Sequence, residues 1–479
     1  MNLNRNLNQK MITRLKFLIL IPAASAVLAA QSQSPQTAIE GETLLHFQAL
    51  LRFDTSDPPG REIEAAEYLA KVLQAEGIPT ETFVLPSDPH RPNVVARLKG
   101  NGKKRPLLLM GHTDVVNVDP KKWTFPPFAA TRDGGYVYGR GAVVDKDNVV
   151  ASLMVMLMLK RQNVPLDRDV IFLAESGEEG STRVGIAFMA NEHPGAIDAE
   201  YCLAEGGNVT RSGGKVQFAS VQTLEKLPHN VQLTARGPAG HGSVPLKSNA
   251  IAHLSAAVAK VADWRPEIRL NETTSAYFKR LAEISPPDQA ARYRAVLNPK
   301  TAAAADEYFL EHEPRHASML RTSVSPNIIN AGYRINVIPS EASANFDVRA
   351  LPDEQMPAFL DQIRKVVNDP TVEVSLAARS SRPGGATTRI DSEAFKTLEA
   401  AVKTHYQSVT LPTMSTGATD MAFLRAKGIQ CYGIGPATDT EDGPKGYGAH
   451  SDQERILESE LHRFVRFYHD VVRQLAAAR

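Results

Sequence analysis

The first stretch that could do chemistry is LLLMGHTDVV, residues 107–116, in which an apolar run leads into His112 and Asp114. Residues two apart in a strand face the same side, so these two side chains can meet. They could form a strand-end histidine capped by a carboxylate, or a zinc-binding histidine whose ring the carboxylate orients. The second arrangement requires the carboxyl edge of a parallel sheet, where α/β sites usually form.

A second apolar run, in LAESGEEGS at residues 173–181, ends in the adjacent glutamates Glu178 and Glu179. Glycines 177 and 180 bracket the pair and present it in a tight loop. Adjacent glutamates are often simply solvated. At a sheet edge, however, one could bind a metal while the other serves as a general base, which takes a proton from water and passes it to a leaving amine.

Two further stretches complete the candidate ligand set. YCLAEGG (201–207) delivers Glu205 just before a glycine turn, and GYGAHSDQER (446–455) places His450 in a glycine-rich loop. Histidine and carboxylate side chains suit zinc, and paired oxygen-rich sites suit two-metal hydrolysis. The sequence therefore predicts a metal-dependent hydrolase.

Taken together, these stretches resemble those of the zinc aminoacylase and carboxypeptidase family. MGHTDVV, GRGA, ESGEEG, AEGG and AHSDQE occur in the family's order over nearly the whole chain after residue 30. The family includes glutamate carboxypeptidases, carnosine dipeptidases, succinyl-diaminopimelate desuccinylases and aminoacylases. The resemblance implies an α/β fold, with a zinc-exopeptidase-like catalytic domain around a mostly parallel sheet and an inserted, smaller α+β lid domain.

The resemblance also implies a role for each residue. Two zinc ions would lie ~3.5–4 Å apart. The implied ligands are His112 and Glu205 for one ion, and Glu179 and His450 for the other. Glu178 would be the general base, and Asp114 would support His112.

In relatives the lid contacts the substrate. GPAGHGSVP supplies His241, which in relatives helps to stabilise the oxyanion, often across a dimer interface; INVIPSEASANFDVRA supplies Asn336 and Arg349, which in relatives hold the substrate carboxylate. The residues alone leave alternatives open: His241 could be a solvated loop histidine, and Arg349 could form a structural ion pair with Asp347. STGATDMA, from Ser415, matches a further substrate loop.

The stretch GRGAVVDKDN, residues 139–148, departs from the family pattern. Relatives have GRGA, one variable residue and then an aspartate that bridges both metals, but position 144 is valine here. Asp145 follows, at a position where relatives often carry a second acidic residue. The loop could shift so that Asp145 binds metal, the site could keep one zinc ion, or the chain could be catalytically impaired. We keep Asp145 as a candidate ligand.

Alternating strands and helices must position these residues. Apolar spacing predicts helices at 39–51, 62–76, 149–159, 249–261, 356–367 and 457–477, and strands at 82–85, 93–98, 106–110, 170–174, 201–204, 231–235, 331–337, 342–348 and 372–376. The segment from about 266 to 325 is polar, favours helix and is broken by prolines. We expect a signal peptide at 1–30, catalytic segments at 31–228 and 351–479, and a lid or dimerisation domain at 229–350.

Composition narrows the partners and the compartment. The 479 residues carry 54 basic and 53 acidic side chains without a basic block, which argues against nucleic acid as a partner. Basic residues precede an apolar run at 17–30 that ends in small residues, which is typical of a signal peptide and too short for a membrane span. We expect an exported, periplasmic or secreted protein without a stable membrane span. Cys202 and Cys431 could be buried free thiols or could form a disulfide, which export would permit.

The predicted function is zinc-dependent hydrolysis of an amide bond in a small substrate with a free carboxylate. Dipeptides, C-terminal residues of short peptides and N-acyl amino acids are the candidate substrates. The family includes homodimers that form through the lid, but the polar segment from about 266 to 325 could alter that interface, so the sequence leaves the assembly open. Because of Val144, the alternative is a catalytically impaired or non-catalytic ligand-binding member of the family.

Overall fold

The computed structural model describes residues 35–377, 382–384 and 387–478. The signal peptide expected at 1–30 lies outside the described residues. Within the described part of the chain, no helix is long and apolar enough to cross a membrane.

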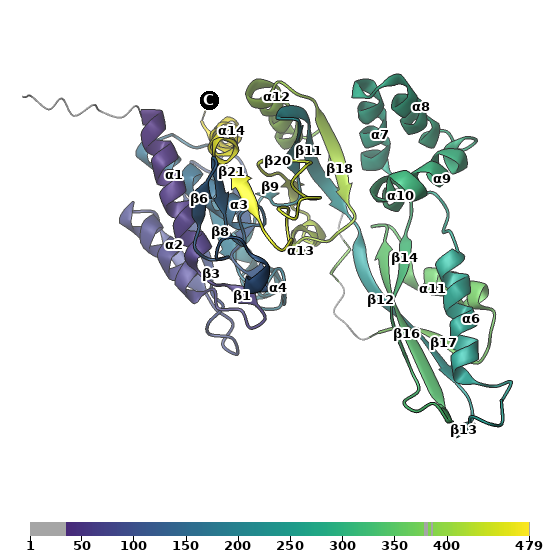
Figure 1. Cartoon of the computed structure of the whole chain (residues 1–479). Coiled ribbons are helices and arrows are strands. Elements are labelled where there is room, and N and C mark those ends of the chain that lie inside the picture. Colours follow the sequence, from purple (N-terminus) through teal and green to yellow (C-terminus); the bar gives the residue numbers. More distant parts are fainter. Residues whose placement is uncertain (1–34, 378–381, 385–386, 479) are drawn as a thin grey trace, which may run out of the picture.

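A mixed, largely parallel sheet forms the centre of the larger domain (Figure 1). Across the sheet the strands are β2 (Thr80–Phe83), β3 (Asn93–Leu98), β8 (Val170–Glu175), β4 (Leu107–His112), β9 (Tyr201–Ala204), β19 (Gln430–Gly433), β11 (Lys215–Glu225), β10 (Asn208–Ser212) and β20 (Ala437–Asp439), with β18 (Thr410–Ser415) paired to β11. The four neighbours β8, β4, β9 and β19 are mutually parallel. The predicted α/β fold with a mostly parallel sheet is therefore confirmed.

Helices cover both faces of this sheet because its central strands are apolar on both sides. In β4, Leu107 and Leu109 join one buried core while Leu108 and Met110 join the other. The helices that pack in the first core are α1 (Pro35–Arg52), α2 (Ile63–Ala75), α3 (Lys146–Arg161), α12 (Glu393–Tyr406) and α14 (Glu458–Ala476). Those that pack in the second are α4 (Ile186–Glu192), α5 (Pro194–Ile197) and α13 (Met421–Ala426). Cys202 and Cys431 face each other on β9 and β19 as buried free thiols.

A smaller domain is built on a separate four-stranded sheet, in the order β14 (Ser323–Ala331), β16 (Glu341–Ala350), β12 (Leu227–Arg236) and β17 (Val372–Leu376). All its pairings are antiparallel. Helices α6 (Ala250–Asp263) and α11 (Met356–Val367) pack with it in one core. The boundary expected at 350 leaves out α11 and β17, which share that core, so this domain runs to Leu376.

One strand of the smaller domain lies where the sequence did not predict it. A strand was expected at 331–337, but β14 occupies Ser323–Ala331 and is the edge strand of the sheet. Pro326 reads as a strand breaker. At a sheet edge, however, proline costs little, because the backbone position that lacks an N–H can face solvent instead of a neighbouring strand.

Four consecutive helices form a further unit beside β18 (Figure 1). They are α7 (Glu272–Ile284), α8 (Pro287–Val296), α9 (Ala302–His312) and α10 (Pro314–Met319). Proline starts α8 and α10 at a position where its missing N–H costs no hydrogen bond. The core of this helical insert, α7–α10, also contains Leu411 and Met414 of β18, which attaches it to the larger domain.

The remaining elements are short and form the rims of the domains. They are β1 (Ser56–Asp57), β5 (Val115–Val116), η1 (Pro120–Lys122), β6 (Thr131–Asp133), β7 (Tyr136–Tyr138), β13 (Gly240–His241), β15 (Val337–Ile338) and β21 (Arg455–Leu457).

Candidate metal centre

The candidate site forms where three neighbouring parallel strands end. His112 closes β4 and lies opposite Glu175, the last residue of β8. Glu205 directly follows β9, which flanks β4 on its other side. The carboxyl ends of parallel strands meet at one edge of the sheet, so residues far apart in the sequence are brought together there.

His112 presents one ring nitrogen to the site and uses the other for support. Its Nδ1 lies 3.0 Å from the backbone oxygen of Asp114 and 3.4 Å from the Oδ1 of that residue. Its Nε2 is buried and has no hydrogen-bond partner. A buried polar nitrogen without a partner is costly, and a ring oriented through Nδ1 is the usual arrangement of a metal-binding histidine.

Asp114 also holds the loop that carries the adjacent glutamates. Its Oδ1 accepts backbone hydrogen bonds from Gly177 at 2.9 Å and Glu178 at 3.1 Å, and its Oδ2 accepts one from Glu179 at 2.9 Å. Gly177 has φ +83°, and a Cβ there would lie 2.5 Å from the backbone oxygen of Ser181, so the turn requires glycine. One buried carboxylate therefore orients both the histidine and the glutamates.

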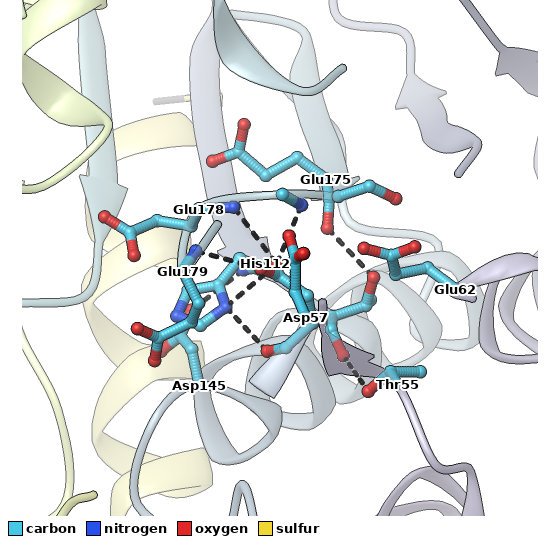
Figure 2. A network of polar contacts seen from close by, with 12 residues as sticks. Thr55, Asp57, Glu62, His112, Asp145, Glu175, Glu178 and Glu179 are labelled. Carbon is cyan, nitrogen blue, oxygen red and sulfur yellow. Dashed lines mark hydrogen bonds and ion pairs between the residues drawn. The ribbon is translucent and has the colours of Figure 1, made fainter. Parts of the chain in front are cut away.

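The ligand atoms of His112, Glu178 and Glu179 lie within 4.8 Å of one another (Figure 2). Glu179 also contacts the second candidate histidine, with its Oε1 2.6 Å from Nε2 of His450. The structure thus gathers two histidines and two glutamates from three separate parts of the sequence. This donor set fits a zinc site.

Burial makes two carboxylates of the site, those of Glu178 and Glu205, reluctant to ionise. Burial raises the pKa of Glu178 above its ordinary value, and the charge of Glu179 adds to the shift, although Arg382 opposes it. Burial and then the charge of Glu178 raise the pKa of Glu205 well above its ordinary value. A bound cation would relieve both effects, because it stabilises the ionised forms.

Glu205 and Val144 lie together in the wall of a cavity beside this cluster. The carboxylate of Asp145 is turned elsewhere: its Oδ2 accepts the backbone N–H of His112 at 3.0 Å, and its Oδ1 accepts from the side-chain amide of Asn148 at 2.7 Å. Asp145 is in neither group of closely spaced candidate ligands among the described residues. It supports the end of β4, while Val144 presents a side chain that cannot bind metal.

Two of the lid residues, His241 and Asn336, lie away from the metal centre of the same chain. His241 lies in β13, at the far tip of the smaller domain (Figure 1). It is exposed and its Nδ1 lies 2.7 Å from the hydroxyl of Ser243. Asn336, directly before β15, is also exposed. Arg349 donates from Nε to both oxygens of Asp347 at 2.9 and 3.0 Å, which is the ion pair left open above.

Comparison with known proteins identifies the family. A family model described as peptidase family M20/M25/M40 matches residues 108–474. The chain belongs to peptidase family M20/M25/M40. The family membership predicted from the motifs is therefore confirmed.

Two relatives show the range of names within the M20 family. The chain is 30% identical over 326 residues to "Probable carboxypeptidase S-like 2" of Dictyostelium discoideum, an alignment that covers 66% of this chain and 62% of that protein. It is 27% identical over 331 residues to human "N-fatty-acyl-amino acid synthase/hydrolase PM20D1", which covers 67% of this chain and 64% of the relative. The matches thus span less than two thirds of either relative's length.

Solved structures of M20 proteins share the fold over almost the whole chain. The M20 family metallo-carboxypeptidase Sso-CP2 from Sulfolobus solfataricus has a TM-score of 0.69 at 21% identity and covers 90% of this chain and 98% of its own. Human carnosine dipeptidase 1 has a TM-score of 0.62 at 15% identity, with coverage of 91% and 97%. At such identities the likeness concerns the fold alone.

The M20 motifs did not reveal every residue that contacts the site. Arg382 donates to Oε1 of Glu178 at 2.8 Å and to Oδ1 of Asp420 at 2.6 Å. Asp420 does lie in the STGATDMA stretch, but no pattern marks Arg382. Asp147 is fully buried and neither of its oxygens has a hydrogen-bond partner. Only its place three residues after Val144 could have drawn attention to it.

Arg91 pairs with a second acidic group beneath the site. Its Nη2 lies 2.5 Å from Asp57 and 2.6 Å from Glu62. These two carboxylates lie close to Asp114 and form the other closely spaced acidic group among the described residues (Figure 2). The guanidinium offsets part of their negative charge, and the group forms a buried ion-pair network next to Asp114.

Proposed function

We propose that the chain is a metal-dependent hydrolase of an amide bond in a small substrate with a free carboxylate. Dipeptides, C-terminal residues of short peptides and N-acyl amino acids are the candidate substrates. The observation that carries the proposal is the unpartnered, buried Nε2 of His112 beside the carboxylates of Glu178 and Glu179. The names of the relatives, a carboxypeptidase and an acyl-amino acid hydrolase, agree with it.

The metal we propose is zinc, in up to two ions. His112 and Glu205 would hold one ion, and Glu179 and His450 the other. Asp145 remains a proposed ligand only if its loop shifts away from the backbone of His112, since both its oxygens are now engaged. Bound zinc lowers the pKa of water and polarises a carbonyl group.

Glu178 is the general base in this proposal. It would remove the proton from the attacking water and deliver it to the leaving amine. Its raised pKa makes the carboxylate a stronger base for the first step, and the carboxylic acid formed there supplies the proton for the second. Arg382 limits that shift and fixes the carboxylate, and Asp114 positions the backbone on which it stands.

The remaining substrate contacts would come from the lid, with His241 supplied by a second copy of the chain. His241 would donate to the developing oxyanion, and Asn336 and Arg349 would bind the substrate carboxylate. The unpaired edge strand β14 exposes Ile328 and Ile329, and such an apolar edge is suited to pairing with another chain. We therefore propose a homodimer through the smaller domain, which would bring His241 to the partner's metal centre.

The location and the domain roles belong to the same proposal. The leader expected at residues 1–30 would direct export to the periplasm or the medium, where nutrient peptides could be degraded. The larger domain would carry the metals, and the smaller domain, extended to Leu376, would serve as the lid.

A second candidate is ligand binding without turnover. The specific observation in its favour is Val144 at the expected bridging position, together with the engaged carboxylate of Asp145. A bridging carboxylate offsets two dications at short range, and valine cannot. This candidate predicts substrate binding with no hydrolysis.

The test is hydrolysis of a panel of dipeptides and N-acyl amino acids by chelator-treated protein, before and after zinc is restored. We expect turnover only with zinc. If the zinc-loaded protein binds the same compounds but releases no product, the hydrolase proposal is rejected in favour of the ligand-binding candidate.

A further inference from the structure

A cavity of about 990 Å³ extends from Glu205, one of the candidate metal ligands, to the helical insert. At one end its wall contains Glu205 and Val144. At the other end it reaches α7, α8 and α10 of the insert, across the faces of β10 and β11. The volume is at the upper end of the range of small-molecule sites and exceeds what a dipeptide needs.

Six large apolar or aromatic side chains line the insert end of this cavity, namely Phe218, Tyr277, Leu281, Ile284, Met319 and Met414. Polar residues line it as well, among them Gln289, Glu313 and His316. Ile284 stands at the opening and is 41% exposed, so an apolar ligand would cover a side chain that water now reaches. Arg315 borders the same end but is itself exposed, so its charge stays in water.

Four of the polar side chains in this wall are paired with one another. The hydroxyl of Tyr277 lies 2.9 Å from Nε2 of His316, whose Nδ1 lies 2.5 Å from Glu313. Tyr293 donates to the same carboxylate at 3.2 Å. These four side chains therefore need no ligand to satisfy their hydrogen bonds, and a peptide packed against them would leave its own backbone groups without partners.

We propose that this cavity is a subsite for an extended apolar acyl chain, so that the preferred substrates are N-acyl amino acids with long acyl groups. The proposal rests on the proposed function and specifies its substrate class. The amide bond would lie at the metal end beside Glu205, the amino acid carboxylate would face the lid, and the acyl chain would run along β11 toward Leu281 and Ile284.

The test is a series of N-acyl amino acids with one amino acid and acyl chains from acetyl to hexadecanoyl, followed by turnover and by calorimetric binding. Each buried methylene should raise kcat/KM or affinity about two- to fourfold until the cavity is full, because its burial stabilises the complex by up to about 0.8 kcal/mol. A profile that is flat or falls with chain length, in both measurements, would overturn the subsite.

A matched pair of variants locates the effect. Ile284→Glu places a charge in the cavity wall and should lower the dodecanoyl-to-acetyl ratio of kcat/KM, or of affinity, at least tenfold. Leu45→Glu, at a site on α1 that is 62% exposed and outside the cavity, should keep the wild-type ratio. An unchanged ratio in Ile284→Glu would contradict the proposal. Chain-length-dependent binding without hydrolysis would retain the subsite and reject the hydrolase instead.

Discussion

At the residue scale, Asp114 is the connection on which the metal centre depends. It contacts the ring of His112 on one side and three successive backbone amides of the glutamate loop on the other. The sequence predicted the neighbours of this carboxylate because each follows a buried strand. Arg382 could not be predicted because it lies outside the helices and strands, where no periodic pattern marks a residue. Asp147 could not be predicted because an aspartate in the first turn of a helix is usually solvated, and only the structure shows that this one is buried.

Glu178 gives the first prediction at this scale. Glu178→Gln removes the base but keeps the size of the side chain, so kcat should fall by about 10²–10⁴-fold while zinc content stays the same. Steady-state kinetics and metal analysis measure the two quantities. Glu67→Gln, on the exposed side of α2, is the control and should match the wild type. Retained turnover in Glu178→Gln would remove Glu178 from the mechanism.

At the element scale, the passage from β11 to β12 joins the larger domain to the smaller one. Lys226, between these strands, is fully buried and donates to the hydroxyls of Ser318 and Ser323 at 3.2 and 3.0 Å. Burial, and then the charges of Arg321 and Arg349, lower the pKa of Lys226 to about 7. Strand and helix periodicity predicted β3, β4, β8 and β9 of the central sheet, but not an amine enclosed where three units meet.

Lys226 gives a prediction of pH-dependent stability. Between pH 7 and about 10.5 the folded chain binds fewer protons at this site than the unfolded chain, so its contribution to the free energy of unfolding should rise with pH. Lys226→Met lacks this contribution. It should be more stable than the wild type by about 2–4 kcal/mol near pH 6.5, and the difference should shrink toward pH 10.

Denaturant unfolding at pH 6.5 and 9.5 measures this difference. Lys279→Met is the control, because Lys279 is exposed on α7 and its replacement should give the same small difference at both pH values. A difference for Lys226→Met that does not change with pH would show that the amine is not held neutral in the folded chain.

At the scale of the whole molecule, the question is how His241 could reach a metal centre. The structure places it at the tip of the smaller domain, on a two-residue strand paired with β15. The order of the motifs predicted an inserted lid domain, but it did not predict the residue at which that domain ends. The apolar faces of α11 and β17 can be assigned to the lid core only once Phe359 and Val374 are seen to pack with Val231.

Subunit complementation tests this arrangement directly. His241→Ala lacks the proposed oxyanion donor and Glu178→Gln lacks the base, so each variant alone should be nearly inactive. After mixing in equal amounts and subunit exchange, half of the dimers should be mixed and contain one complete site, which restores about a quarter of wild-type activity. No recovery in mixed dimers, with the mixed species verified by mass, would place His241 outside the partner's site.

The central claim is that the chain hydrolyses amides although Val144 replaces the expected bridging aspartate. The most direct measurement compares wild type and Val144→Asp on the same panel of dipeptides and N-acyl amino acids, with zinc added and zinc content determined. The account predicts turnover by both proteins, since His112, Glu178, Glu179 and His450 are all gathered in the wild-type site. Turnover by Val144→Asp alone would contradict it and would leave the natural chain a ligand-binding member of its family.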